Sequence, residues 1–407
     1  MTVNRKTSTR RILFIIVVLL LLSGCWDRKE IEERATILGL AVDLAEDEEE
    51  PTATTHPENV DVPSSNLGLI KITAQLAVPG QVPLGPSQGG DGSSSQNAVW
   101  VVEGIGHTME DAVQNIQQQL AHKIFFGQLQ VIILSEDVAK KGISHINEYL
   151  RRRPEIRRTA WMAINGKNAA ETMEVAPRLE RIPSIYLSTM FEEATKMGKF
   201  PEADLGRFWV QTSNIGQDGF LPYISVKSKE NIEISGMAYF NEDKMVGKTK
   251  PYQIAFYNSV AGINPGGAAA LIKLSDDESV MFESTRRKTS YDVRMKENLP
   301  YFFITIDIWG LIKEKSTDKL KLDDKKTIEK IEKLAEEHGK REMLKLISET
   351  QDNESDIFGF GEYVRGDLSS FWDEEVKNST GWKKVYQDLP IDIKVRIHID
   401  RVGMKAK

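Results

Sequence analysis

The sequence predicts a multidomain α+β protein, with two or three mixed α/β domains and mainly antiparallel sheets. Three observations lead to this prediction. The chain has 407 residues, which is more than a single hydrophobic core usually serves. Between Thr108 and Val175, short runs of β-branched residues alternate with amphipathic stretches that have helical spacing. After Asn231 the pattern changes to long alternating strands with few helices between them.

The chain begins with a segment typical of a secretory leader. Its first eleven residues carry four cations and no acidic residue, and the apolar run Ile12–Leu22 follows. At ~1.5 Å per residue this run spans about 16 Å, roughly half of the ~30 Å hydrocarbon core of a bilayer. The run is therefore too short for a transmembrane helix, and residues 1–24 are predicted to be a signal peptide.

The apolar run ends in Leu22-Ser23-Gly24-Cys25, and Cys25 is the only cysteine of the chain. Leu three positions before a cysteine, with two small residues between them, has the spacing of the bacterial lipobox. We predict that Cys25 is a lipidation site, carrying a diacylglyceryl thioether and an N-acyl group such as palmitate. Two or three acyl chains would hold the protein on a membrane. The alternative, an uncleaved anchor with a chance cysteine, does not explain why the single thiol lies at this position.

Composition restricts the class of partner. The chain has 53 Lys+Arg against 60 Asp+Glu, a net charge of −7, and loss of the four leader cations makes it −11. An acidic body of this kind argues against a nucleic-acid partner, which requires clustered positive charge. Since the single cysteine is predicted to be acylated, no intrachain disulfide is expected.

The first half of the mature chain is divided into two regions. Residues 25–66 are predicted to form an N-terminal lipidated segment with the first strand and an acidic linker. Residues 67–230 are predicted to form an N-terminal α/β region, which makes two domains together with residues 35–44. The linker Ala45–Asn66 and the Gly/Ser-rich loop Gly80–Asn97 have too few apolar residues to order themselves. The expected strands are Ala35–Leu44, Leu67–Pro79, Ala98–Ile105, Gly127–Ser135 and Arg158–Gly166, and the expected helices are Thr108–Lys123, most of Glu136–Arg153, Lys167–Val175, Ile182–Gly198 and Glu202–Ser213.

Residues 231–407 are predicted to form a C-terminal α+β domain. The expected elements are a hairpin over Asn231–Lys248, helices over Pro251–Gly262 and Asp324–Gln351, and strands over Ser279–Met295, Pro300–Ile312 and Pro390–Val402. The last strand alternates strictly between isoleucine or valine and polar residues. This alternation predicts a half-buried antiparallel strand.

The residues give no sign of catalysis, of a cofactor or of a metal, and none is predicted. No two of the six histidines have the i, i+4 spacing of a helical zinc site. Gly262–Ala270 has glycines spaced as in a phosphate loop but offers Ala268 and Ala269 where Lys and Ser/Thr are needed. The basic run Arg151–Arg158 could meet an acidic partner, but such a run is more often a solvated helix end with ion pairs to neighbouring acids.

The segment Gly24–Asp43 resembles the N-terminus of the C subunits of spore germinant receptors, the Ger(x)C family. It has a lipobox cysteine followed by Trp-Asp, a short acidic stretch, and an apolar strand that ends in Asp43. Further similarities follow in the same order along nearly the whole chain: "FGQLQVIILSED", "RRRPEIRR", "GMAYFNEDKMVG" and Trp382 before the terminal strand.

The resemblance implies a non-catalytic lipoprotein in a receptor complex that lets bacterial spores respond to small-molecule germinants. It implies integral-membrane A and B subunits as partners, a place on the extracytoplasmic face of the spore inner membrane, and a fold of three mixed α/β domains. Only Cys25 carries over as a defined functional residue. Which germinant is sensed, and whether this subunit contacts it, stays open. Two other readings also stay open: a lipid-anchored solute-binding protein, which needs two similar lobes around a cleft, and a cell-wall hydrolase, for which no catalytic pattern is visible.

Overall fold

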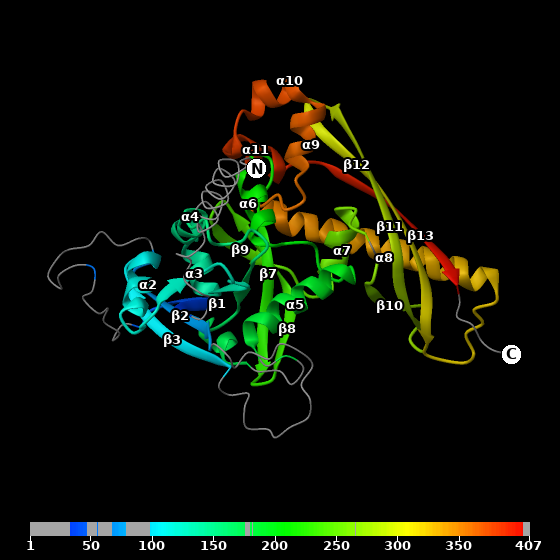
Figure 1. Ribbon diagram of the computed structural model, residues 1–407. Helices are drawn as coiled ribbons and strands as arrows, with labels where there is room; N and C mark the ends of the chain where they lie inside the picture. The colour runs from blue at the N-terminus through cyan, green and yellow to red at the C-terminus, as the bar shows by residue number, and fades with distance from the viewer. Residues whose placement is uncertain are drawn as a thin grey trace, which may run out of the picture.

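Two β-sheets organise the protein in the computed structural model (Figure 1). The structure describes residues 33–46, 55, 67–78, 98–175, 180, 182–264 and 266–401. The first sheet has nine strands in the order β3-β2-β1-β5-β6-β7-β8-β9, with β4 paired to β1, and the second has four in the order β10-β11-β12-β13. Most of the two predicted loops, Ala45–Asn66 and Gly80–Asn97, lies outside the described residues.

The first sheet is parallel in its middle and antiparallel at both ends. Strands β1, β5, β6 and β7 pair in parallel, whereas β2, β3, β8 and β9 join by antiparallel pairing. Six of the eleven strand pairings in the described residues are antiparallel, which confirms the predicted mixed fold with mainly antiparallel sheets. The strands are β1 (Arg34–Leu44), β2 (Ile70–Ala77), β3 (Val99–Gly106), β4 (Lys123–Phe125), β5 (Val131–Ser135), β6 (Trp161–Asn165), β7 (Phe220–Ser228), β8 (Asn231–Asn241) and β9 (Lys244–Lys248).

The helices of this half begin where the sequence offers capping side chains. Thr108, Ser135 and Asp204 accept hydrogen bonds from backbone N–H groups at the starts of α2, α3 and α6. The predicted helical stretch after Ser135 is two helices, because Gly142 has a φ of 120° and ends α3. The helices are α2 (Met109–Gln117), α3 (Glu136–Lys141), α4 (Ser144–Arg151), the 3₁₀ helix η2 (Ala170–Met173), α5 (Pro183–Lys196) and α6 (Leu205–Ser213).

The first sheet extends across residue 231, the predicted start of the C-terminal domain. Strands β7 and β8 form an antiparallel hairpin around that position, and β9 continues the same sheet. The predicted hairpin Asn231–Lys248 is therefore confirmed, and it pairs with strands that precede it in the chain. The division into domains itself stays a prediction.

The second sheet contains a long hairpin. Strands β11 (Ser279–Lys296) and β12 (Leu299–Lys315) pair over nearly their whole length, and both turn residues, Glu297 and Asn298, have positive φ, as a tight hairpin turn requires. Strand β10 (Ala269–Lys273) pairs with β11, and β13 (Ile391–Arg401) pairs with β12.

The pairing of the last strand corrects one prediction. Strand β13 runs parallel to β12, not antiparallel as expected. Its alternation is as predicted, since Ile393, Val395 and Ile397 are buried while Lys394 and Arg396 are exposed. Alternation reports which side of a strand is buried but not the direction of its neighbour. The direction is set by the helices between β12 and β13, which supply the long crossover that parallel strands need.

Those helices are α8 (Lys325–Asp352), α9 (Phe360–Asp367), α10 (Ser369–Phe371), the π-helix η3 (Trp372–Val376) and α11 (Ser379–Gln387), while α7 (Gln253–Val260) precedes the sheet. Helix α8 runs along β13, and the Glu336 and Glu332 carboxylates accept hydrogen bonds from the Ile397 and Ile399 N–H groups, at 3.0 and 2.9 Å. The carboxylates occupy backbone donors that an edge strand would otherwise offer to another chain.

Candidate functional site

The predicted lipidation site, Cys25, lies outside the described residues, which begin at Glu33. Its role stays a prediction. Asp43, the last polar residue of the N-terminal motif, lies near the end of β1 and is buried. Its carboxylate accepts hydrogen bonds from the N–H groups of Ala169 and Ala170, at 2.7 and 3.0 Å, at the start of η2. Burial raises the pKa of Asp43. The motif aspartate therefore ties the first strand to a turn 126 residues away.

The basic run Arg151–Arg158 begins at the last residue of α4. Its first three arginines contact neighbouring groups. Arg152 pairs with Glu148 at 2.6 Å, and Arg153 pairs with Glu110 on α2. The Arg151 guanidinium donates to the Trp209 carbonyl oxygen at 3.3 Å and lies over the Trp209 ring. The prediction of a helix end with local ion pairs is confirmed for Arg152 and Arg153, whereas Arg151 contacts neutral groups of α6.

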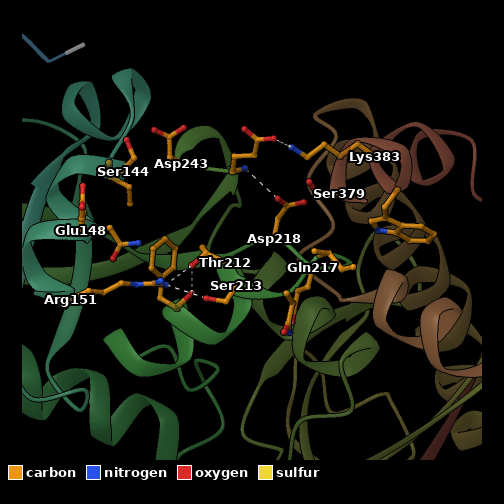
Figure 2. Close-up of a pocket in the computed structure, with 17 residues that line it drawn as sticks. Ser144, Glu148, Arg151, Thr212, Ser213, Gln217, Asp218, Asp243, Ser379 and Lys383 are labelled. Atoms are coloured by element: carbon orange, nitrogen blue, oxygen red, sulfur yellow. Dashed lines mark hydrogen bonds and ion pairs between the residues drawn. The ribbon is translucent and has the colours of Figure 1, made fainter. Parts of the chain in front are cut away.

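A cleft of about 440 Å³ separates the first-sheet half from the C-terminal helices (Figure 2). Helices α4 and α6 form one wall, the β8–β9 turn and the loop after α6 form the base, and α11 forms the other wall. Its polar lining includes Ser144, Glu148, Arg151, Asp218, Asp243 and Lys383. The cleft thus combines both signs of charge and residues from both halves of the chain.

Two buried aspartates join the halves at the base of this cleft. Asp218, before β7, accepts a hydrogen bond from the Asp356 N–H at 2.9 Å, and the Asp218 N–H donates to the Asp356 carbonyl oxygen at 2.9 Å. The Asp356 carboxylate in turn accepts from the N–H groups of Gly359 and Gly361, both at 2.9 Å, and from Trp382 Nε1 at 3.0 Å. Two loops more than a hundred residues apart are therefore bonded through their backbones and their carboxylates.

Burial dominates the electrostatics of this pair. The Asp356 side chain is almost fully enclosed, and burial raises its pKa to about 7 despite the donors around it. Burial also raises the pKa of Asp218. Burial disfavours the charged form of a carboxyl group, so both pKa values are raised. A raised carboxyl pKa can accompany catalysis, but it also occurs in structural networks.

The backbones of the two halves also lie in close contact beside these aspartates. A Cβ atom added to Gly216 would lie 2.5 Å from the Gly361 carbonyl carbon, so neither residue can carry a side chain without displacement. The Gly216 N–H also donates to Glu362 Oε1 at 2.9 Å. On the other side of Asp218, Lys383 of α11 pairs with Glu242 at 2.8 Å and donates to Asn241 Oδ1 at 2.5 Å. We call the set Asp218, Asp356, Trp382 and Lys383 the junction.

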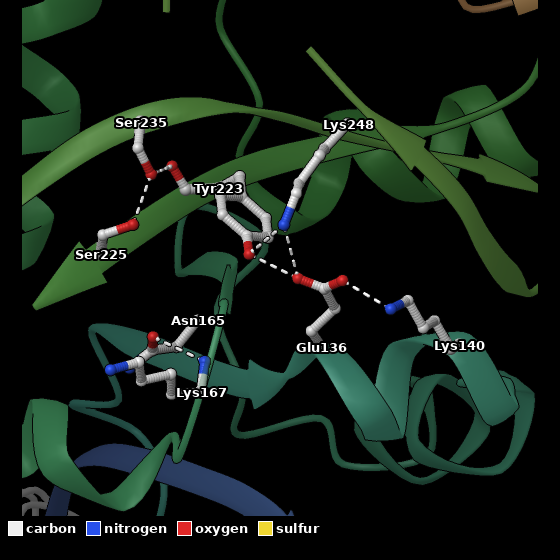
Figure 3. Close-up of polar contacts among 8 residues, drawn as sticks. All are labelled: Glu136, Lys140, Asn165, Lys167, Tyr223, Ser225, Ser235 and Lys248. Atoms are coloured by element: carbon white, nitrogen blue, oxygen red, sulfur yellow. Dashed lines mark hydrogen bonds and ion pairs between the residues drawn. The ribbon is translucent and has the colours of Figure 1, made fainter. Parts of the chain in front are cut away.

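A second polar cluster lies on the first sheet (Figure 3). Glu136 begins α3 and accepts hydrogen bonds from Lys140, Lys248 and the Tyr223 hydroxyl, and Lys248 also donates to the Tyr223 oxygen at 2.6 Å. Burial alone would raise the pKa of Glu136, but these three donors outweigh it and lower that pKa to about 2. The cluster connects α3 to strands β7 and β9 and holds Glu136 ionised.

Replacing Glu136 with glutamine should remove stability that depends on its charge. Because the folded-state pKa is depressed, this stability is present above the ordinary glutamate pKa and is lost as the pH falls towards 2. Both lysines are half-exposed and screened by solvent, so the expected loss at pH 7 is about 1–2 kcal/mol. Urea unfolding at pH 7 and pH 3 measures it: the gap between the variant and the wild type should be roughly half as large at pH 3 as at pH 7. An equal gap at both pH values would contradict the assignment.

None of these features forms a recognisable reaction centre. In the cleft, Arg151 and Lys383 are both engaged by protein groups, and no described serine or threonine of the lining has a histidine beside it. Across the part of the chain that the structure describes, no group of three or more His, Cys, Asp or Glu side chains could hold a metal ion. No described helix is both long and apolar enough to cross a membrane. What the contacts at the junction show is hydrogen bonding between the two halves of the described chain.

Sequence reasoning missed the junction because its residues lie far apart in the chain. The glycines of Phe358–Gly366 serve hydrogen bonding and close packing, roles that depend on partners elsewhere in the chain. Trp382 was singled out only through the family resemblance. The available signal was Asp356 followed by glycines three and five residues later, since an aspartate whose side chain accepts from the next backbone N–H groups is typical of a turn.

Comparison with known proteins places the chain in a family. Residues 27–226 match the model described as spore germination protein N-terminal domain, and residues 235–403 match the model described as spore germination B3/GerAC like, C-terminal. Spore germination protein KC of Bacillus subtilis (strain 168) is 25% identical over 430 aligned positions, covering 96% of each chain. Spore germination protein GerQC of Bacillus cereus is 23% identical and covers 78% of this chain and 85% of its own.

The fold also matches a solved structure. The crystal structure of the GerBC protein superposes with a TM-score of 0.55 at 16% identity, covering 82% of this chain and 94% of that chain. At this identity the likeness is one of fold. The two family models together span most of the chain, and they confirm the resemblance drawn from Gly24–Asp43. The chain belongs to the GerAC-like family of spore germination proteins, the C subunits of spore germinant receptors.

Proposed function

We propose that this protein is a lipid-anchored, non-catalytic subunit of a nutrient germinant receptor, required for the response of spores to small-molecule germinants. It is anchored through Cys25 on the extracytoplasmic face of the spore inner membrane and assembles there with integral-membrane A and B subunits. The observation that carries the proposal is the lipobox Leu22–Cys25 directly before a chain that matches both family models.

The tether explains how such a body can act on membrane partners. Acyl chains confine the protein to a thin layer beside the membrane, which raises its effective concentration near partners without any further contact. The acidic body would be weakly repelled by anionic headgroups, so the acyl chains must provide the attachment.

The junction supports a role in assembly rather than in catalysis. Its charged and polar groups bond one another across the two halves, and this arrangement stabilises their relative position. A fixed arrangement of two sheets presents constant surfaces to partners, which a subunit of a complex requires.

The solute-binding alternative has less support. A solute-binding protein of that class needs two similar lobes facing a cleft, whereas the described residues form a nine-stranded and a four-stranded sheet with different topologies. The cleft in Figure 2 lies between unlike parts.

Replacing Cys25 with serine should abolish lipid attachment, because no other thiol exists in the chain. We expect the variant to stay unprocessed or to leave the membrane fraction, while the fold of the body is unchanged. The matched control is Ser23→Ala, which keeps a small residue in the lipobox and should be processed normally. Fractionation with mass spectrometry of the N-terminal peptide measures both. An unmodified Cys25 in membrane-bound wild-type protein would contradict the proposal.

A further inference from the structure

The four-stranded sheet has one covered face and one open face. On the covered face, side chains of the strands contact helices α7, α8 and α9. The Thr289 hydroxyl donates to the Ser259 carbonyl oxygen of α7 at 2.6 Å, and the Phe302 ring lies 4.8 Å from that of Phe360 on α9. Helix α8 buries Ile393, Val395 and Ile397 of β13. Residues that alternate with these point to the opposite face, where no helix of the described chain packs.

Strand register arranges the open face in rows. One row is Arg286, Trp309 and His398, the next is Lys288, Asp307 and Arg396, and the third is Ser290, Thr305 and Lys394. Each row crosses β11, β12 and β13. We call Arg286, Lys288, Trp309, Lys394, Arg396 and His398, around Asp307, the basic–aromatic face.

The centre of this face is held rigidly. The Arg286 guanidinium lies 3.9 Å from the centroid of the Trp309 ring, and the His398 imidazole stacks on the same indole at 5.1 Å with an interplanar angle of 24°. Arg396 contacts Asp307 through two hydrogen bonds of 2.6 and 2.8 Å, and His398 Nε2 lies 3.3 Å from Asp307 Oδ1. Preorganised aromatic and arginine side chains lose little entropy on binding and are typical of interface hot spots.

The face has an excess of positive charge in an acidic protein. Asp307 is the only carboxylate in the three rows, and it neutralises Arg396. Arg286, Lys288 and Lys394 are exposed, and none forms an ion pair within the described residues. Three cations without an ion pair in the described residues thus lie on one face of the second sheet, in a chain whose net charge is −7.

We propose that the basic–aromatic face docks an acidic segment of a partner protein. Resting on the proposed function, that partner is a membrane subunit of the receptor, which contributes a stretch rich in aspartate or glutamate outside the bilayer. The charges would steer association, and Trp309 would provide the apolar anchor. A protein partner is favoured over a lipid surface because the Trp309 ring is stacked against Arg286 and His398 and is therefore not free to insert into a bilayer.

The test uses full-length, tagged protein in its own host. Lys288→Glu/Lys394→Glu reverses two charges that have no ion-pair partner in the described residues, so the fold should tolerate it. Lys333→Glu/Lys345→Glu makes the same change in charge on exposed positions of α8 and is the matched control. We expect the first variant to retain about tenfold less A and B subunit after purification from solubilised membranes, and the control to match the wild type. Equal retention by both variants would overturn the proposal.

A photocrosslinker identifies what lies on the face. A benzoylphenylalanine at exposed Ser290, in the third row, should crosslink to an Asp/Glu-rich peptide of another protein, and Lys288→Glu/Lys394→Glu should abolish the product. Crosslinks only to lipid, only to a second copy of this chain, or to nothing would overturn the proposal. Charge-dependent crosslinking to an acidic protein other than the A and B subunits would support the docking face while contradicting the proposed receptor assembly.

Discussion

Replacing Trp382 with alanine should lower the free energy of unfolding by about 3–5 kcal/mol, as truncation of a large core aromatic does. Trp382 is the largest fully buried side chain of the described chain, at 1% exposure. Its ring lies 5.8 Å from that of Trp372, and its Nε1 donates to Asp356. Truncation therefore leaves a cavity and removes a donor from a buried carboxylate at the same time.

Two comparisons isolate these effects. Trp382→Phe keeps most of the volume but removes the N–H group, so its loss should be about 1–2 kcal/mol. Trp100→Ala removes a half-exposed indole on β3 and should cost much less than Trp382→Ala. Equilibrium unfolding in urea measures all three. Similar losses for Trp382→Ala and Trp100→Ala would contradict the central place of Trp382 in the core.

Replacing Asp356 with asparagine should change how stability depends on pH. The folded-state pKa of Asp356, about 7, lies above its ordinary value of 3.8. The stability that this group contributes is therefore fully present below pH 3.8 and is lost as the pH rises through 7, because only the folded state keeps the proton in that range. The amide of Asp356→Asn stays neutral throughout.

The wild type should accordingly lose about 2 kcal/mol relative to Asp356→Asn between pH 5 and pH 7.5, since each unit of pKa corresponds to ~1.4 kcal/mol. Asp356→Ala should be destabilised at both pH values by about 2–4 kcal/mol, because three buried donors lose their acceptor. Urea unfolding of the three proteins across this range gives the result. A difference between the wild type and Asp356→Asn that is constant with pH would show that Asp356 is ionised in the folded protein.

Much of the local structure followed from the sequence. Thr108, Ser135 and Asp324 cap helices whose starts the pattern predicted, because an N-cap acts on its own first turn. The alternation in Ile391–Ile399 gave the buried face of β13 correctly. Its parallel direction could not be read from alternation, since it depends on the crossover through α8 and the later helices.

The candidate site was harder to predict than the fold. Asp218 and Asp356 are separated by 138 residues, and nothing in either local sequence indicates that their backbones meet. The basic–aromatic face could not be predicted from the sequence for a similar reason. Arg286, Trp309 and His398 come from three strands, and only the register of two separate pairings places them in one row. The role of Cys25 stays a prediction, and it rests on a contiguous pattern, the lipobox, that needs no tertiary information.

The most direct test of the proposed function is the germination response of a strain in which this gene is deleted, complemented with wild-type protein or with Cys25→Ser. Germination is followed by loss of optical density and release of dipicolinate, with each nutrient class supplied separately. We predict that deletion slows or abolishes the response to one nutrient class without affecting spore formation, and that only the wild-type protein restores it. Normal germination of the deletion strain with every nutrient, also after removal of related receptors, would contradict the account.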